Sequence, residues 1–303
     1  MKTIQIIGAP TDIGASMRGS SMGPEALRIA QLQASLERQG LQVLDSGNLA
    51  GPANPWLPPE QGLRHLDQAV AWNRLVRDAV GEALKLQRLP LLMGGDHCLA
   101  IGSISAVASH CADRGRKLIV LWLDAHADAN TSRTTPSGNL HGMPVACLLG
   151  HGPTTLGRIG PEDRPALSPH MLRQIGIRSV DAGERRHLKA LNLCVYDMRH
   201  IDENGMRLTM EQALRDLDED THLHVSFDVD FLDPAIAPGV GTAVRGGPTY
   251  RETQLCMEMI ADTGRLGSLD VMELNPACDV RNGTAEVMVE FLESLFGKST
   301  LLR

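Results

Sequence analysis

Short, mainly apolar runs alternate with segments of helical pattern from one end of the chain to the other. These runs span residues 4–7, 42–44, 89–93, 118–123, 174–177, 194–196, 223–227 and 267–272. Strands that alternate with helices are typical of βαβ units, in which parallel strands are covered by helices on both faces. The sequence therefore predicts an α/β fold around a mainly parallel sheet.

The segments between the strands indicate helices, loops and one domain. A proline in a first helical turn opens a helix predicted over residues 24–39. A loop rich in proline and glycine follows at 46–62, and a long helix runs from there to about Gln87. Residues 151–168 are predicted to form a surface connection rather than a linker, so we expect a single domain over residues 1–303.

Composition excludes several classes of protein. The chain has 29 Lys and Arg against 36 Asp and Glu, a net charge of −7, and no basic block, so neither nucleic acid nor an anionic membrane is an expected partner. We find no signal-peptide core and no apolar run near the roughly 20 residues that span a bilayer. Six cysteines without a C-x-x-C pair predict reduced thiols and a cytoplasmic protein.

Residues able to bind metals or transfer protons follow five of the predicted strands. They are His97; Asp124, His126 and Asp128; Asp181; Asp228 and Asp230; and Glu273. In proteins with an open parallel sheet, ligands bind beyond the carboxyl ends of the strands. We therefore expect these side chains to face one cleft. A single Asp or His after a buried strand is more simply explained as a polar loop residue than as a metal ligand.

The segment Asp124-Ala-His-Ala-Asp128 is different, because its three polar side chains occupy alternate positions. They would point the same way if strand geometry continued through the segment. With His97, Asp228 and Asp230, these residues supply four carboxylates and two imidazoles. This is more than one ion needs, so two ions with bridging carboxylates are predicted. This ligand set suits manganese, and cobalt, iron or zinc are chemically possible. Two ions about 3.5 to 4 Å apart lower the pKa of a bridging water, which implies a hydrolase.

Three motifs resemble the metal signatures of the ureohydrolases, the arginase and agmatinase group. They are Gly94-Gly-Asp-His97, Asp124-Ala-His-Ala-Asp128, and Ser226-Phe-Asp-Val-Asp230 with Leu232-Asp-Pro234. The resemblance extends from Gly8 to Pro276. It implies a three-layer α/β/α fold with a parallel eight-stranded sheet, and two Mn²⁺ per subunit. It also implies hydrolysis of L-arginine to L-ornithine and urea by a metal-bridging hydroxide. A protonated, resonance-stabilised guanidinium needs such a strong nucleophile.

The resemblance assigns roles residue by residue. The metal ligands are His97, Asp124, His126, Asp128, Asp228 and Asp230. Asp128 would also accept a hydrogen bond from the hydroxide, and Glu273 would pair with the guanidinium. His141 corresponds to the histidine that shuttles a proton to the leaving amine.

The substrate-binding segment resembles the arginase version rather than that of agmatinases. Asn130 and Ser137 match positions that bind the α-carboxylate, with Thr135 and Asn139 as neighbours. Asp181 matches the contact to the α-amino group. Glu184 is a further substrate-binding candidate, and either Glu184 or Thr242 could support the site from behind. Agmatine lacks the carboxylate and would leave these polar groups unpaired.

Departures from the commonest family pattern are Cys98, Phe231 and the pair Ser132-Arg133. We interpret the first two as packing neighbours, whereas the third bears on affinity for the α-carboxylate. His222 and His224 precede the third metal motif and are interpreted as packing residues.

Two other functions stay open. One is hydrolysis of agmatine or a guanidino acid, and the other is a noncatalytic metal-dependent binding or regulatory role. Family members are commonly trimers or hexamers, so a homo-oligomer is expected.

Overall fold

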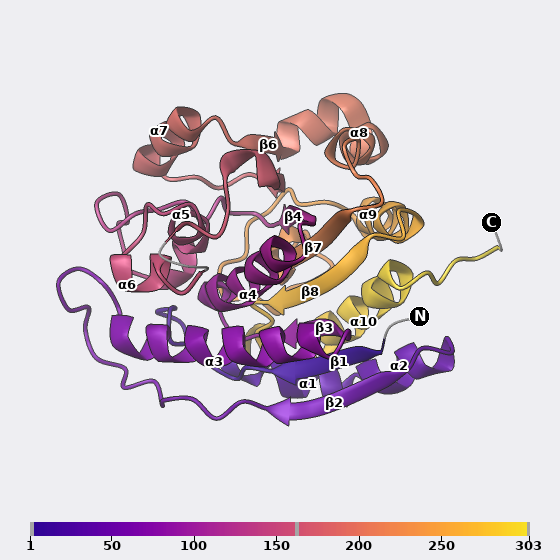
Figure 1. Cartoon of the computed structure of the whole chain (residues 1–303), viewed down its shortest axis with the longest axis horizontal. Helices are drawn as coiled ribbons and strands as arrows, with labels where there is room; N and C mark the ends of the chain where they lie inside the picture. Colours follow the sequence, from indigo (N-terminus) through magenta and orange to yellow (C-terminus); the bar gives the residue numbers. More distant parts are fainter. Residues whose placement is uncertain (1–2, 161–163, 302–303) are drawn as a thin grey trace.

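One eight-stranded sheet runs through the molecule, and all of its strand pairs are parallel (Figure 1). The computed structural model describes residues 3–160 and 164–301, so residues 161–163 of the predicted connection lie outside the described residues. The strands are β1 (Ile4–Gly8), β2 (Val43–Asn48), β3 (Leu89–Met93), β4 (Lys117–Leu123), β5 (Leu172–Ile177), β6 (Cys194–Asp197), β7 (Thr221–Asp228) and β8 (Leu266–Met272). Their order is β2-β1-β3-β8-β7-β4-β5-β6, which confirms the predicted fold class.

Helices cover both faces of this sheet and give a three-layer molecule (Figure 1). One face carries α1 (Gly23–Ile29), α2 (Leu32–Arg38), α8 (Met198–Ala213), α9 (Tyr250–Asp262) and α10 (Gly283–Leu295). The other carries α3 (Leu66–Lys85), α4 (Ala100–Asp113), α5 (Pro144–Leu148) and α6 (Thr154–Gly157), with α7 (Ala182–Leu191) packed at its margin.

Strand β4 shows how the sequence builds two core layers. Val120 and Trp122 lie in the layer beneath α3 and α4, whereas Leu121 and Leu123 lie in the layer beneath α8 and α9. Successive side chains of a strand point to opposite faces, and a parallel strand covered on both sides therefore reads as an unbroken apolar run.

The helix predicted over residues 24–39 is wrong in one respect, because the structure divides it into α1 and α2. Gln31 between them adopts a left-handed conformation with φ 63°. In one continuous helix of 3.6 residues per turn, Leu27 and Leu32 would point in nearly opposite directions. The break turns the second helix so that both leucines are buried in the same core.

Two compositional expectations can be compared with the structure. All six cysteines are free thiols, as predicted. Within residues 3–160 and 164–301, no helix is both long and apolar enough to cross a membrane.

An ion pair fastens α1 to the edge strand β2. Arg28 donates two parallel hydrogen bonds to Asp45, Nε to Oδ2 at 2.7 Å and Nη2 to Oδ1 at 2.9 Å. The two side chains are only 21% and 22% exposed. The hydrogen bonds from Arg28 lower the pKa of Asp45, although partial burial opposes this.

We expect Asp45→Asn to lower the free energy of unfolding by about 1 kcal/mol at neutral pH. Because the folded pKa of Asp45 lies below the unfolded value of about 3.9, this stabilisation is present above that pH and is lost as the pH falls further. Urea denaturation at several pH values should show the difference from wild type shrinking below about pH 4. Asp78→Asn, which removes an exposed partner of Arg77, is the control and should have almost no effect. Equal stability of both variants at neutral pH would contradict the assignment.

Candidate active site

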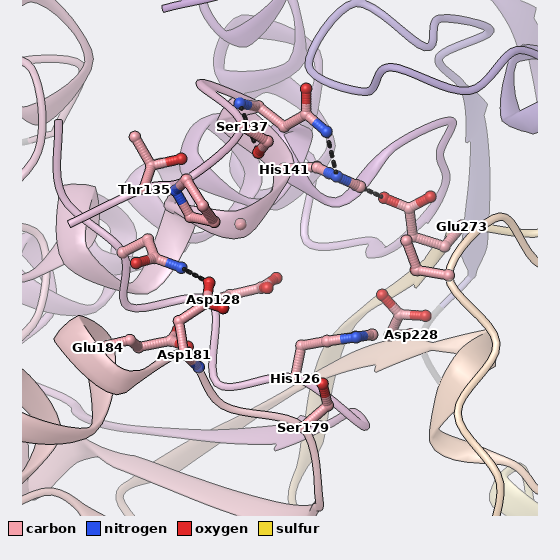
Figure 2. A pocket seen from close by; sticks show the side chains of 15 residues that line it. His126, Asp128, Thr135, Ser137, His141, Ser179, Asp181, Glu184, Asp228 and Glu273 are labelled. Atoms are coloured by element: carbon pink, nitrogen blue, oxygen red, sulfur yellow. Dashed lines mark hydrogen bonds and ion pairs between the residues drawn. The ribbon is translucent and has the colours of Figure 1, made fainter. Parts of the chain in front are cut away.

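The five strand ends that carry predicted site residues are neighbours in the sheet. Strands β3, β8, β7, β4 and β5 are adjacent in this order, although they are far apart in sequence. Their carboxyl ends surround one cavity of about 240 Å³ (Figure 2). The cavity is lined by His126, Asp128, Asn130, Thr135, Pro136, Ser137, Asn139, His141, Gly142, Ser179, Asp181, Glu184, Asp228, Thr242 and Glu273. The structure thus brings the predicted residues into one site.

Three of the predicted metal ligands lie beneath the cavity surface. His97 and Asp230 are 1% exposed and Asp124 is 0% exposed. They form a polar floor between the cavity and the core. Buried charged groups of this kind require compensation by partners or by a bound cation.

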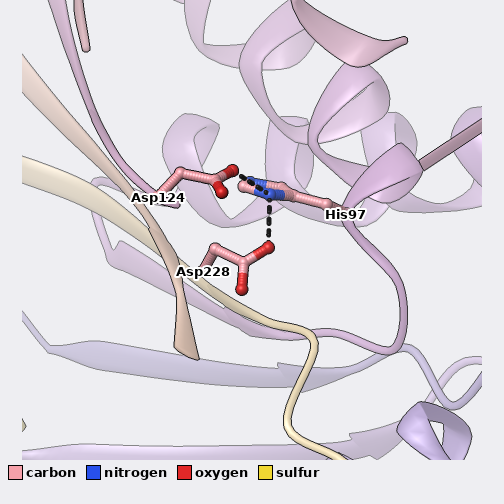
Figure 3. Close-up of side chains that lie close together, drawn as sticks. All are labelled: His97, Asp124 and Asp228. Carbon is pink, nitrogen blue, oxygen red and sulfur yellow. Dashed lines mark hydrogen bonds and ion pairs between the residues drawn. The ribbon is translucent and has the colours of Figure 1, made fainter. Parts of the chain in front are cut away.

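A first ligand cluster surrounds His97 (Figure 3). The Nδ1 atom of His97 lies 3.0 Å from Asp228 Oδ2, 3.2 Å from Asp124 Oδ2 and 3.3 Å from Asp128 Oδ2. One imidazole nitrogen and three carboxylate oxygens from the ends of β3, β4 and β7 therefore converge on one point.

A second cluster forms around His126 and shares Asp124 with the first. The Nδ1 atom of His126 lies 3.0 Å from Asp230 Oδ2 and 3.6 Å from Asp124 Oδ1. Asp124 thus turns one oxygen toward each histidine. In both groups, His97 with Asp124 and Asp228, and His126 with Asp124 and Asp230, the ligand atoms lie within 4.8 Å of one another. Nitrogen and carboxylate donors at this spacing fit divalent cations such as manganese.

The electrostatics of the floor also favour cations. Burial, reinforced by Asp124, raises the pKa of Asp128 well above its ordinary value. Burial opposes protonation of His97 and His126, but the surrounding carboxylates outweigh it and raise their pKa values to about 9 and about 12. The site therefore concentrates negative charge that a metal ion would neutralise.

Two supporting residues fix the His97 ring, and neither was predicted as functional. Its Nε2 atom lies 2.9 Å from Ser226 Oγ, and the ring stacks on Trp122 with centroids 4.1 Å apart. Trp122 Nε1 also donates to Asp124 Oδ2 at 2.8 Å. Trp122 and Ser226 each lie two positions before a candidate ligand, Asp124 and Asp228. Because side chains two apart on a strand face the same side, this spacing could have identified both residues from the sequence.

The condition that strand geometry continues through Asp128 is not met, although His126 still forms an isolated parallel bridge with Ser179. Strand β4 ends at Leu123, and Asp128 adopts a left-handed conformation with φ 51°. Glu273 is likewise left-handed, with φ 65°. Such conformations cost about 1–3 kcal/mol and persist only where surrounding contacts impose them. Here Val145 N donates to the Asp128 carbonyl, and Glu273 N donates to the Gly95 carbonyl.

Gly95 allows the chain after β3 to pass close to the backbone of Thr11. A Cβ atom at this position would lie 1.6 Å from the Thr11 carbonyl oxygen. Only glycine fits at this position. The chain turns after it, and His97 lies two residues further on, beneath the cavity.

Glu273 and His141 form a hydrogen-bonded pair on the cavity wall (Figure 2). Glu273 Oε1 accepts from His97 N and lies 2.9 Å from His141 Nδ1. Burial opposes protonation of His141, but Glu273 outweighs it and raises the pKa of this imidazole. Asn139 Nδ2 lies 3.4 Å from the second ring nitrogen of His141.

The opposite end of the cavity is polar. Asn130 Nδ2 donates to Asp181 Oδ2 at 2.9 Å. The hydroxyls of Thr135 and Ser137 accept backbone N–H groups within their own loop. Among the described residues, the buried Oδ1 atoms of Asn130 and Asn139 have no hydrogen-bond partner. These two oxygens can therefore accept hydrogen bonds from a polar ligand.

Glu184 lines the cavity and also supports it. Its two carboxylate oxygens accept from Ala129 N at 2.8 Å and from Asp181 N at 3.1 Å. These bonds join the start of α7 to the segment after Asp128. Thr242, the other residue that the sequence placed near the site, donates to Asp230 Oδ2 at 2.9 Å.

The residues interpreted as packing lie outside the cavity. His222 and His224 are buried, and both bond to Ser268 Oγ, at 2.9 and 2.8 Å. Cys98 and Phe231 are fully buried, as expected for packing neighbours.

Comparisons with known proteins point in one direction. A model described as "Arginase family" matches residues 2–297. The arginase of Brucella melitensis is 44% identical over 303 residues, which cover 99% of this chain and 97% of that protein. The arginase structure from Bacillus caldovelox superposes with a TM-score of 0.94 at 40% identity, covering 99% of this chain and 100% of that one. The Bacillus subtilis arginase structure gives 0.90, also at 40% identity and with the same coverage.

We expect Glu184→Ala to lower the free energy of unfolding by about 1–3 kcal/mol, because two backbone N–H groups lose their acceptor. Glu184→Gln keeps one acceptor oxygen, so its free energy of unfolding should lie between those of the wild type and Glu184→Ala. Chemical denaturation measures both. The control is Glu211→Ala, which removes an exposed i,i+4 pair with Arg207 and should cost little. A Glu184→Ala protein as stable as this control would contradict the supporting role.

Proposed function

The chain belongs to the arginase family, and we propose that it hydrolyses the guanidino group of L-arginine to give L-ornithine and urea. One observation carries the proposal: two carboxylate–imidazole clusters share Asp124 beneath a cavity that has a carboxylate on its wall and a polar far end. This arrangement suits a cationic guanidinium attached to a polar amino acid.

The proposed cofactor is a pair of Mn²⁺ ions per subunit. His97, Asp124, Asp128 and Asp228 would hold one ion, and His126 and Asp230 would hold the other together with the shared Asp124. When bound, such ions lower the pKa of water so that hydroxide is available near neutral pH.

The residues of the cavity orient the substrate for attack. Glu273 places a carboxylate where it can pair with the guanidinium and hold its central carbon above the floor. Asp128 lines the same cavity and would accept a hydrogen bond from the attacking oxygen. The two carboxylates thus fix the two reacting partners.

His141 handles the proton that the leaving group needs. An amine leaves readily only when it is protonated, and an imidazole whose pKa is raised by Glu273 keeps its proton to higher pH than a free imidazole does. Its Nδ1 contact with Glu273 keeps the ring at the cavity wall.

The far end of the cavity favours arginine over agmatine. Asn130, Thr135, Ser137 and Asn139 would meet the α-carboxylate, with Asp181 at the α-amino group and Glu184 behind it. Agmatine has no carboxylate and would leave these groups unpaired, which costs binding free energy. Hydrolysis of agmatine or a guanidino acid is the alternative function. Assembly as a homo-oligomer stays a prediction.

The purified protein, stripped of metal and reloaded with Mn²⁺, should release urea from L-arginine with a kcat/KM about 100-fold or more above that for agmatine. Stripped protein without added metal is the control and should be nearly inactive. Equal rates on the two substrates would exclude the proposed specificity. Absence of urea release from either substrate would favour a noncatalytic binding role.

His141→Ala should lower kcat for L-arginine by about 10²- to 10⁴-fold, because the leaving amine loses its proton donor. Binding of Mn²⁺, measured by titration, should be unchanged because His141 lies outside both ligand clusters. His170→Ala alters an exposed histidine and serves as the matched control. Wild-type turnover by His141→Ala would rule out the shuttle.

A further inference from the structure

Arg178 follows β5 directly, and its guanidinium is surrounded by backbone carbonyl groups. Nη2 donates to the carbonyls of Asp230 at 2.8 Å, Val244 at 2.8 Å and Leu232 at 3.2 Å. Nη1 donates to those of Phe231 at 3.0 Å and Gly176 at 3.2 Å, and Nε donates to Val244 at 3.2 Å. Arg178 therefore clamps the turn that contains the ligand Asp230 against the end of β5.

The main chain of the same residue holds the other half of the His126 cluster. The N–H groups of Arg178 and Ser179 both donate to the Ala125 carbonyl, at 2.8 and 3.0 Å. Ala125 stands between the ligands Asp124 and His126, and its own N–H donates to Asp230 Oδ1 at 3.2 Å. One residue thus sets the spacing between two ligand-bearing segments.

A third segment is attached through Val244. Thr242, two residues before it, donates its hydroxyl to Asp230 Oδ2 at 2.9 Å. Because Arg178 holds the Val244 carbonyl twice, it also fixes the loop from which Thr242 orients the Asp230 carboxylate.

The first cluster has different supports. His97 is held by the Ser226 hydroxyl, the Trp122 ring and the Glu273 carboxylate. The hydrogen bonds that the structure records for Arg178, within residues 3–160 and 164–301, go to the segments around Ala125, Asp230 and Val244 and to Gly176 in β5. Loss of Arg178 should therefore affect the two clusters unequally.

We propose that Arg178 is a positioning residue for the ion held by His126, Asp124 and Asp230. It belongs to neither ligand cluster, does not line the cavity, and acts by holding the backbone that presents the ligands. The inference rests on the proposed two-ion hydrolase. Arginine suits the role because its planar fork offers five N–H donors, whereas lysine offers three on one atom and methionine offers none.

The test compares wild type, Arg178→Lys, Arg178→Met and the control Arg207→Met, which alters an exposed residue of α8. Each protein is stripped of metal and titrated with Mn²⁺, and free Mn²⁺ is followed by electron paramagnetic resonance. Circular dichroism verifies that each variant is folded.

Wild type and Arg207→Met should bind two ions. Arg178→Met should keep one ion at near wild-type affinity and bind the other about 10- to 100-fold more weakly, with Arg178→Lys in between. Urea release by the Arg178 variants should need correspondingly more Mn²⁺ and should recover toward the wild-type kcat at saturating metal.

Wild-type affinity for both ions in the two Arg178 variants would overturn the inference and leave the proposed function intact. Equal weakening of both ions would also overturn it, because it would indicate a general loss of structure. If Arg178→Met does not fold, Arg178→Lys decides the outcome by the same criteria. Wild-type protein that binds no Mn²⁺ would contradict the proposed function itself, and the inference with it.

Discussion

The burial of four carboxylates at the ends of two adjacent strands is the constraint on which the rest of this site depends. Strands β4 and β7 pair side by side, so Asp124 and Asp128 meet Asp228 and Asp230 away from water. Local backbone N–H groups take up part of this charge, since His126 N donates to Asp124 and Asp230 N donates to Asp228. These bonds alone compensate only part of the negative charge. A site of this kind is stable in its folded form when cations complete it.

Different elements of the chain carry the separate tasks of the site. The ends of β3, β4 and β7 build the floor, β8 supplies the carboxylate that faces it, and the loop after Asp128 provides the polar far end. The fold has a close counterpart in an arginase structure at 40% identity. In the proposed function, substrate choice depends on the loop, where exposed Ser132 and Arg133 depart from the commonest pattern. The reaction type and the substrate preference thus rest on different parts of the molecule.

The sequence was sufficient for the fold class and for most of the residues around the cavity, because strands follow strong local patterns and the site motifs resemble those of a known family. It could not place the break at Gln31 or the left-handed conformation of Asp128, since tertiary packing decides both. The supports of the site were also missed. Trp122 looks like any core residue of a strand, and Arg178 acts through backbone carbonyls that no side-chain motif reveals. Glu184 was recognised as a neighbour of the site, but its two backbone hydrogen bonds became visible only in the structure.

The order of strands in the sheet has a consequence for how the protein is made. His97 meets Glu273 across 176 residues and Asp228 across 131 residues. Strand β8 lies between β3 and β7, so the centre of the sheet is closed by the last strand to leave the ribosome. Contacts of such long separation form slowly, because loop-closure entropy must be overcome first. Four of the six candidate metal ligands, His97, Asp124, His126 and Asp128, are therefore synthesised by residue 128, whereas Asp228 and Asp230 follow 100 residues later. Strand β8, which joins β3 to β7, comes later still, so the ligands can come together only after it has emerged.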